Sequence, residues 1–590
     1  MRIVLHREIP EDQTLRDRWD ELVEQMERPE VFYTYEWALA ASCAYRDSIT
    51  PLLVLGYEGA ALAGVIALAT DKAQKRAFFL AGATADYCDF VSSPELLSEF
   101  VNAVFAELRK LNLRMIVFAN LPADSATSDA LGRAASDHGY SSFRRPGYEC
   151  ERIEFASPQQ RALVKQSVQR KQLRYNLKAM VKIAPVAVSH SRSWDDVANT
   201  LPGFVKAHIA RFLATGRISN LVRPERRVFL SELARLCSRR GWIVHSRLMI
   251  GERPAAWNYG FQFAGSWFWY QPTFQSDLKQ YSPGFCLLSK IVEEACDTPG
   301  MNLVDLGLGS ENYKERLATG TRQTVHITAT TSRMVWAKEV VRYHLAGVIK
   351  SMPRLENAIR STLNQVSLLR KRFHNGGPVG LLRSSWRWCR KALFGQSEMF
   401  FFEWREGISS VVSPDSDSLS IEPLDLNLLA IAAMNYFDDP ETLTYLLRAA
   451  KQLISVELQG FALLRSDGVP VHFCWATRFE GFRVKELNHI LEAPSLDSVL
   501  LFDCWTPPSV RGRRYGSMAI SYVAARLRDS GKTPWIFSAA ANTPFTRGAE
   551  KSAFTLRFSL TQKRRMFLGK VVQSKSLINA PTPVDVSSAA

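Results

Sequence analysis

The sequence predicts an α/β protein in which mixed sheets are flanked by helices. Short apolar strands alternate with amphipathic helices from the N-terminus to about residue 335. The alternation begins again near residue 396, after a basic stretch with helical spacing. At 590 residues the chain is too long for one hydrophobic core, so we expect three or four domains.

Composition excludes several other classes of protein. Hydrophobic residues make up 46% of the chain, which argues against wholesale disorder. The nine cysteines are odd in number and lack CxxC spacing, so we expect neither a disulfide framework nor a zinc ribbon, and a reducing cytosol is the simplest location. Residues 1–12 lack an apolar core, so we expect no signal peptide. The ten scattered histidines give no metal signature.

Positive charge is concentrated in one segment. The formal net charge is +16, and residues 338–391 contain twelve Lys or Arg against two acidic residues, an excess of ten. One interpretation is a solvated basic connector. The other is a surface that meets anionic lipid or an acidic partner. Nucleic acid is less well supported, because no recognised binding motif accompanies the charge.

Residues 1–150 are expected to form a first α/β unit. Apolar spacing predicts helices over 15–26, 96–111 and 126–138, and an aromatic run leads into a helix around Trp37. We expect strands over 51–57, 62–69, 77–81 and 114–119.

Residues 151–335 are expected to form a second α/β unit. We expect one basic helix over 159–181, then helices over 194–200 and 204–213 separated by Pro202-Gly203, and another over 224–239. Strands are predicted over 243–250, 254–262 and 266–271, followed by a helix over 285–296 and a strand over 302–306.

A signature closes this second unit. Tyr281-Ser282-Pro283-Gly284 precedes the helix, and Asp305-Leu306-Gly307-Leu308-Gly309 precedes Tyr313-Lys314. Together with the basic helix around Arg170, this pattern resembles the FemAB-like branch of the GNAT acyltransferases, specifically the CelD-like acetyltransferases of cellulose biosynthesis. The resemblance also includes Asp86-Tyr87-Cys88-Asp89 after a glycine turn, and the aromatic residues before Trp37.

The resemblance implies roles for these residues. Gly284 lies where a helix N-terminus would hold the pyrophosphate of an acyl-CoA. Asp305, at a strand end, is the candidate general base, Tyr313 is a candidate proton donor to the leaving thiolate, and Lys314 could orient a carboxylate or phosphate. The expected substrate-binding residues are Asp86, Asp89, Arg170 and Arg174. The alternative is that these residues have only structural roles, with the acids capping turns and the cations solvated at the surface.

Residues 336–395 are predicted to be a basic helical linker, with helices over 335–349 and 355–373. A third α/β unit is predicted over 396–572. We expect strands over 399–404, 409–412, 460–465, 469–478, 482–489, 498–505 and 534–539, and helices over 438–451 and 518–528. We expect residues 573–590 to be a disordered tail.

A loop in this third unit resembles motif A of the GNAT superfamily. A strand runs into Pro507-Pro508-Ser509-Val510-Arg511-Gly512-Arg513-Arg514-Tyr515-Gly516-Ser517, and a helix follows. The resemblance implies that acyl-CoA is bound by Arg511, Gly512, Arg514, Gly516, Ser517 and Asn542. Arg514 stands where the superfamily has its first glycine, so acyl-CoA binding by this unit is in doubt. Glu486 is the candidate base here.

The sequence therefore predicts tandem GNAT units joined by a helical linker. The expected activity is transfer of an acyl group, in particular acetyl, from acyl-CoA to an amine or hydroxyl, without a metal, in exopolysaccharide or cell-envelope synthesis. The first alternative is an aminoacyl-tRNA-dependent transferase that extends a peptidoglycan precursor. The second is a catalytically degenerate scaffold of a polysaccharide-synthesis system. We expect a cytoplasmic protein, with peripheral contact at the inner face of the membrane through the linker as a further possibility.

Overall fold

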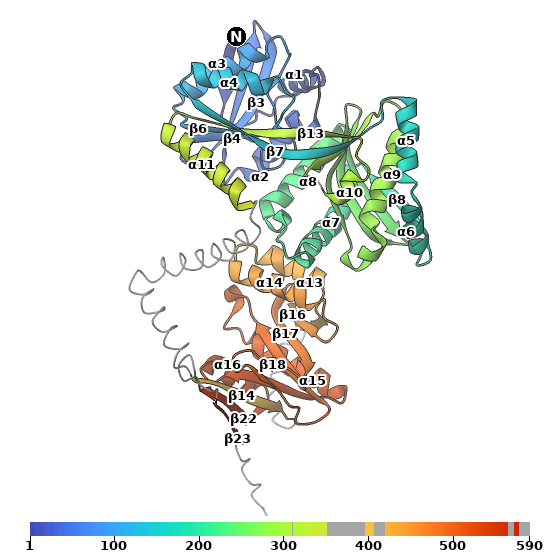
Figure 1. Cartoon of the computed structure of the whole chain (residues 1–590), viewed down its shortest axis with the longest axis vertical. Helices are drawn as coiled ribbons and strands as arrows, with labels where there is room; N and C mark the ends of the chain where they lie inside the picture. Colours follow the sequence, from blue (N-terminus) through green and yellow to red (C-terminus); the bar gives the residue numbers. More distant parts are fainter. Residues whose placement is uncertain (310, 351–395, 406–418, 564–571, 578–590) are drawn as a thin grey trace, which may run out of the picture. The chain divides into compact units, whose positions relative to one another are not determined.

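The computed structural model describes residues 1–309, 311–350, 396–405, 419–563 and 572–577 (Figure 1). The chain divides into two compact units. The first contains residues 1–211 and 223–351, and the second contains residues 212–222 and 352–590. None of the helices described is long and apolar enough to cross a membrane.

The first unit is built on one sheet of 13 strands. Its order is β1-β2-β3-β4-β6-β13-β7-β12-β11-β10-β9-β8, and β5 pairs with β3. The strands are β1 Arg2–His6, β2 Thr50–Glu58, β3 Ala61–Thr70, β4 Arg76–Phe79, β5 Val91–Ser92, β6 Met115–Pro122, β7 Ser141–Glu154, β8 Val186–Ser191, β9 Ile243–Ile250, β10 Arg253–Phe263, β11 Ser266–Phe274, β12 Leu303–Leu308 and β13 Gly320–Thr330.

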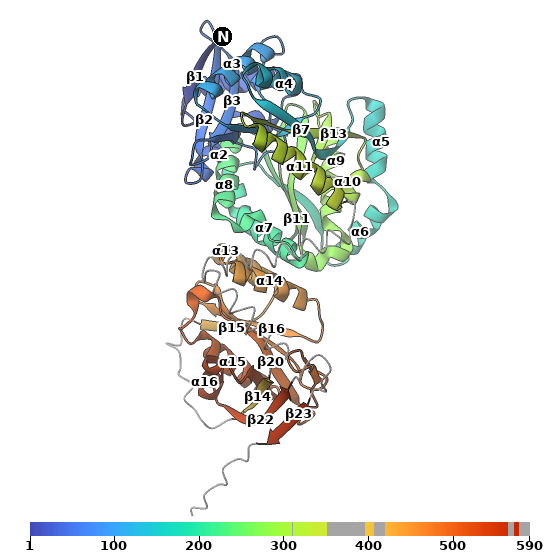
Figure 2. The same cartoon turned by 60° about the vertical axis from the view of Figure 1, so that its left-hand side comes forward.

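The helices of the first unit lie on the faces of this sheet (Figures 1 and 2). They are α1 Gln13–Glu24, α2 Tyr35–Tyr45, α3 Leu97–Lys110, α4 Thr127–Asp137, α5 Pro158–Val168, α6 Lys171–Val181, α7 Trp194–Ala214, α8 Pro224–Arg239, α9 Pro283–Asp297, α10 Asn312–Glu315 and α11 Arg333–Lys350, with short 3-10 helices η1 Val31–Tyr33 and η3 Ser276–Tyr281. The last residues of α7 and the 3-10 helix η2 Asn220–Val222 belong to the second unit. One apolar core joins α5, α6 and α9 to β9 through β12.

Two strands connect the halves of this sheet. The last strand, β13, pairs with β6 of the first half and also with β7, and β7 pairs in turn with β12. Neither β7 nor β13 was predicted from the sequence. These two strands hold the halves together at the place where the candidate site lies.

Two helix predictions in this unit were wrong. The expected helix over 159–181 is two helices, because Arg170 is extended (ψ 150°). Val168 and Leu173 are both buried, and a straight helix could not turn residues five apart toward the same core. Conversely, α7 continues through Pro202, because Val197, Leu201 and Phe204 form one buried stripe whose packing outweighs the lost hydrogen bond.

The second unit has a sheet of eight strands in the order β15-β16-β17-β20-β21-β14-β22-β23. The strands are β14 Gln396–Trp404, β15 Leu419–Pro423, β16 Gln459–Arg465, β17 Pro470–Arg478, β20 Ser498–Trp505, β21 Thr533–Ala539, β22 Phe554–Lys563 and β23 Val572–Leu577; β18 Arg483–Val484 and β19 His489–Ile490 pair separately. The helices are α13 Leu426–Asn435, α14 Pro440–Gln452, α15 Tyr515–Asp529 and α16 Thr543–Lys551, with the 3-10 helix η4 Pro508–Val510.

Other predictions are corrected or lie outside the described residues. The expected strand over 482–489 is a reversal between β18 and β19, in which Asn488 has a positive φ of 48°. Residues 572–577 pair with β22, so the expected disordered tail is wrong for that stretch.

Three predictions lie outside the described residues. They are the strand expected over 409–412, the helix expected over 355–373 and the rest of the tail. α11 confirms the helix expected over 335–349.

Candidate active site

The first feature of the site is a pair of parallel strands that separate. β11 and β12 pair only from Ser266 with Leu303 to Phe268 with Asp305. Beyond this point β11 continues to Phe274 and β12 to Leu308 without pairing to each other. The backbone groups between them are available to a bound chain, because a strand edge without a partner presents N–H and C=O groups.

The loop after β11 leads into the N-terminus of α9. Ser282 has a positive φ of 50° and Pro283 opens the helix. Gly284 follows, at a position where the backbone N–H has no partner within a helix. A Cβ at Gly284 would lie 3.3 Å from Cδ1 of Phe274, so the helix begins close to the end of β11. This end of α9 can hold an anion beside the separated strands.

Asp305 lies at the point of separation. It is 1% exposed, and its Oδ2 accepts a hydrogen bond from the Tyr87 hydroxyl at 3.0 Å. The same oxygen lies 3.3 Å from Nε of Arg152, and Oδ1 accepts from the Gly307 amide at 2.8 Å. Both carboxylate oxygens are therefore engaged within the protein. This geometry favours a positioning role for Asp305 over the predicted role of general base.

Asp86 is the second carboxylate of the site, and it is only partly buried. Burial and the charge of Asp305 raise its pKa from 3.8 to about 7, against the opposing charges of Lys314 and Arg226. No hydrogen bond or ion pair joins Asp86 to another residue in the described ranges. Its Oδ2 lies against Gly307, where an added Cβ would approach to 2.6 Å. Among the described residues, Asp86 is thus a carboxylate without a hydrogen-bond or ion-pair partner, and its pKa is near neutrality.

Lys314 and Tyr313 come from the short helix α10. The Nζ of Lys314 is buried and donates to the carbonyl oxygens of Leu308 and Gly309, both at 3.1 Å. Lys314 therefore holds the glycine turn that follows β12, and its charge faces Asp86. The Tyr313 hydroxyl accepts from Nε1 of Trp269 on β11 at 3.3 Å. Burial raises the pKa of Tyr313, so its hydroxyl keeps its proton at neutral pH.

Tyr87 also lies beside a network of ion pairs centred on Arg322. The Arg322 guanidinium lies 4.8 Å from the centre of the Tyr87 ring and donates to Glu30 at 2.6 Å and to Asp124 at 3.1 Å. Burial raises the pKa of Glu30 to about 7, against the opposing charge of Arg322. The sequence analysis missed Arg152 and Arg322, because they lie on β7 and β13.

Other predicted residues lie apart from this site. Asp89 accepts from the Phe90 amide at 2.8 Å and from the side chains of Ser125 and Thr127. Arg170 and Arg174 are exposed at α6 and have no described contact with Asp86 or Asp305. Trp37 is fully buried and donates to Thr84, so it is a core residue.

Nucleophilic alternatives are not supported by the geometry. Burial raises the pKa of the Cys150 thiol, beside Tyr87, to about 12, so the thiol is neutral. His190 lies 2.8 Å from both the Ser246 hydroxyl and a Glu294 carboxylate oxygen, but Ser246 is fully buried and cannot meet a substrate. Within the described residues no group of three or more His, Cys, Asp or Glu could hold a metal ion.

The motif-A loop of the second unit also follows a pair of separating strands. β20 and β21 pair only as far as Leu501 with Ile536. Gly512 has a φ of 84°, and Arg514 takes the left-handed conformation with a φ of 62° at the residue that caps α15. Arg511 donates to the Thr506 carbonyl at 3.0 Å and stacks 4.9 Å from the Trp505 ring centre. The loop is thus formed with arginine at the glycine position.

The remaining predicted residues of the second unit surround this loop. Gly516 faces His472, and the Ser517 hydroxyl donates to the Gly548 carbonyl at 3.4 Å. Asn542 is exposed before α16. The predicted base Glu486 is exposed in the turn between β18 and β19 and not on a strand, since Arg483 donates to Asn488 and closes that turn.

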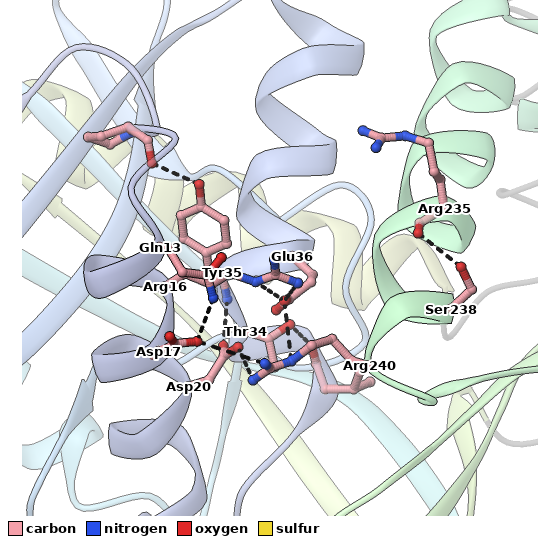
Figure 3. Close-up of polar contacts among 12 residues, drawn as sticks. Gln13, Arg16, Asp17, Asp20, Thr34, Tyr35, Glu36, Arg235, Ser238 and Arg240 are labelled. Carbon is pink, nitrogen blue, oxygen red and sulfur yellow. Dashed lines mark hydrogen bonds and ion pairs between the residues drawn. The ribbon is translucent and has the colours of Figure 1, made fainter.

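A buried acid pair lies elsewhere in the first unit (Figure 3). Asp20 of α1 and Glu36 of α2 are 2% and 0% exposed. Arg16 lies 2.6 Å from Glu36, and Arg240, after α8, lies 2.9 Å from Asp20. Burial and the neighbouring Glu36 raise the pKa of Asp20 from 3.8 to about 8. Oε2 of Glu36 is buried and lacks a hydrogen-bond partner.

This pair should make stability depend on pH. The folded Asp20 keeps a proton that the unfolded chain releases near pH 4, so the free energy of unfolding should fall as the pH rises from about 4 to about 8. Glu36→Gln places an amide donor at the unpartnered position, beside Asp20, and removes a charge. We expect this variant to be more stable than the native chain at pH 8 by roughly 1–3 kcal/mol, with a flatter pH dependence.

Unfolding by denaturant between pH 5 and pH 9 measures this effect. Glu24→Gln, at the exposed last residue of α1, is the control for loss of one acidic charge. Parallel pH curves for the native chain and Glu36→Gln would show that the two carboxylates do not share a proton.

One known protein family matches part of the chain. Residues 167–315 match the family described as acetyltransferase (GNAT) domain. No curated protein matches the chain. The match and the mixed sheets of both units confirm the predicted fold class.

Similar solved structures extend over about half of the chain. A conserved protein of unknown function from Bacteroides thetaiotaomicron is 8% identical, with a TM-score of 0.40 over 56% of this chain and 100% of that chain. FemX is 10% identical, with a TM-score of 0.39 over 55% of this chain and 97% of its own. A tandem GNAT protein from the clavulanic acid biosynthesis pathway is 11% identical, with a TM-score of 0.33 over 56% of this chain and 99% of its own.

Proposed function

We propose, from the acetyltransferase (GNAT) domain at residues 167–315, that this chain is an acyltransferase that moves an acyl group from acyl-CoA to an amine or hydroxyl. The observation that supports this most is the position of Asp86. A carboxylate with a pKa of about 7, without a partner among the described residues, lies where two parallel strands separate on the way to a helix N-terminus.

In the proposed reaction the donor lies between β11 and β12. The N-terminus of α9 at Gly284 holds the pyrophosphate. Asp86 takes a proton from the acceptor as its nitrogen or oxygen attacks the thioester carbonyl carbon. The carbon–sulfur bond then breaks, and the coenzyme A thiolate takes a proton from the neutral Tyr313 hydroxyl. Asp86 releases the acceptor's proton to solvent and Tyr313 takes one up from solvent, so both side chains return to their starting states.

The other residues position these groups. Asp305 fixes Tyr87 and Arg152 across the two halves of the sheet. Lys314 holds the turn that follows Gly307, and Asp86 lies against Gly307. The acceptor that we propose is a saccharide or envelope precursor, as the resemblance to CelD-like proteins implies.

Acyl-CoA binding tests the donor site. A ligand that binds only the folded state raises the melting temperature, so acetyl-CoA or a longer acyl-CoA should raise the Tm of the native chain. Gly284→Glu places a negative charge at the phosphate position, and it should abolish the rise without unfolding α9, because an acidic residue suits a helix N-terminus.

Two further variants locate the donor. Gly284→Ala adds the Cβ without the charge and should retain most of the rise. Arg511→Glu changes the motif-A loop of the second unit and should retain all of it. If only Arg511→Glu removes the rise in Tm, the donor binds in the second unit. That result would contradict the role of Asp86. The absence of any rise would support the scaffold alternative.

A further inference from the structure

Helix α6 packs one face into the core of the second half of the first unit. Leu173, Asn176 and Met180 are buried, and the two apolar side chains join the core that includes α9. The helix also contacts η3, the segment that precedes α9. Figures 1 and 2 show α6 at the outside of this half. Its opposite face is therefore available to a partner.

That outer face carries a row of cations. Lys171, Arg174, Lys178 and Lys182 follow the spacing i, i+3, i+7 and i+11, which places them on one side of a helix, and Arg170 precedes them. All five side chains are exposed, and none has an ion-pair partner among the described residues. Residues 155–194 contain no Asp or Glu. This charge is not neutralised by the part of the chain that the structure describes around it.

Large apolar side chains lie among these cations. Tyr175 is 67% exposed, Val181 is 56% exposed and Ile183, just after the helix, is 55% exposed. Leu163 of the neighbouring α5 is 66% exposed. These four exposed apolar side chains, grouped beside the charges, form the kind of mixed surface that marks an interaction site.

We propose that the outer face of α6 docks on the surface of a bilayer that contains anionic phospholipid. Lys and Arg near such a surface are attracted to lipid phosphates. Val181 and Ile183 can enter the boundary between headgroups and acyl chains, and tyrosine favours that boundary. RNA also attracts cations, but aliphatic side chains offer bases no stacking surface, so the observations favour lipid.

Docking is independent of the proposed acyl transfer. It requires only the charge and the exposed apolar groups of α6, and it would hold if the chain bound no acyl-CoA. Because α6 contacts η3, docking would also bring the start of α9 near the membrane.

Vesicle sedimentation with the full chain tests the proposal. The native chain should bind phosphatidylcholine vesicles that contain phosphatidylglycerol, bind pure phosphatidylcholine weakly, and lose binding as salt increases. Lys171→Glu, Arg174→Glu and Lys178→Glu together should lower the partition coefficient roughly 100-fold, since each cation contributes about fivefold. Tyr175→Ser, Val181→Ser and Ile183→Ser together should lower it about tenfold or more.

The control makes the same change of charge elsewhere. Lys72→Glu, Lys75→Glu and Arg133→Glu alter exposed cations outside α6 and should leave binding within about twofold. Melting temperatures check that all three variants fold. Native binding by the α6 charge variant would overturn the proposal and place any membrane contact elsewhere, for example in residues 336–395. An equal loss of vesicle binding in the control variant would show that net charge alone attracts the protein to vesicles, and it would overturn the proposal. If the native chain bound duplex RNA, and the α6 charge variant lost RNA binding but kept vesicle binding, the partner would be RNA. That result would also overturn the proposal.

Discussion

Replacing Asp86 by asparagine is expected to lower kcat/KM for acyl transfer by about 10²- to 10⁴-fold, the usual contribution of a general base. Asparagine keeps the size of the side chain but cannot take the proton of the acceptor. Asp86 makes no hydrogen bond or ion pair to another described residue, so the change should leave the fold intact. Removing a carboxylate whose pKa is raised by burial should even raise the melting temperature slightly at pH 8.

Asp89→Asn is the matched control, because Asp89 belongs to the same loop but is held by Ser125 and Thr127, away from Asp305. Its kcat/KM should change much less than that of Asp86→Asn. An Asp86→Asn variant that keeps native kcat/KM would show that another group accepts the proton.

Replacing Arg322 by methionine is expected to lower the free energy of unfolding by about 3–5 kcal/mol, because removing one partner leaves buried charge uncompensated. Arg322 is 5% exposed and donates to Glu30, which is 3% exposed. The loss should be smaller at pH 5 than at pH 8. Without Arg322 the pKa of Glu30 rises above about 7, so at pH 5 the folded chain holds Glu30 neutral.

Denaturant unfolding of Arg322→Met at the two pH values measures this loss. Arg316→Met removes an exposed cation without a described ion pair and should change stability by about 0.5 kcal/mol or less. Equal, small losses in both variants would mean that the Arg322 network does not hold the two halves of the sheet together.

Strands with strong apolar patterns could be predicted from the sequence, and the two connecting strands could not. β9 and β20 match their predicted bounds because buried side chains dominate β9, and every side chain of β20 is buried or partly buried. β7 alternates exposed and partly buried residues and contains Pro146-Gly147, so it has the composition of a loop. It is a strand because β13 and β12 pair with its two edges, which is a tertiary effect.

The candidate site was predicted in part. The signature located Asp305 and Lys314, and the short motif located Asp86, more than 200 positions earlier in the chain. Their roles could not be read from spacing, because they depend on which carboxylate the fold buries. Arg152 engages Asp305 from β7, which was not predicted, and so Asp86 is the carboxylate without a partner among the residues that the structure describes.

The pH dependence of kcat/KM tests the central claim most directly. For the native chain, kcat/KM should rise about tenfold per pH unit below pH 7 and level off above it, because only the ionised Asp86 accepts a proton. The assay should use a hydroxyl acceptor, because a hydroxyl group does not ionise over this pH range. Asp89→Asn should follow the same curve, and the residual activity of Asp86→Asn should lack the rise. A native rate that stays level down to pH 5, or the same curve in Asp86→Asn, would contradict the assignment of Asp86 as the general base.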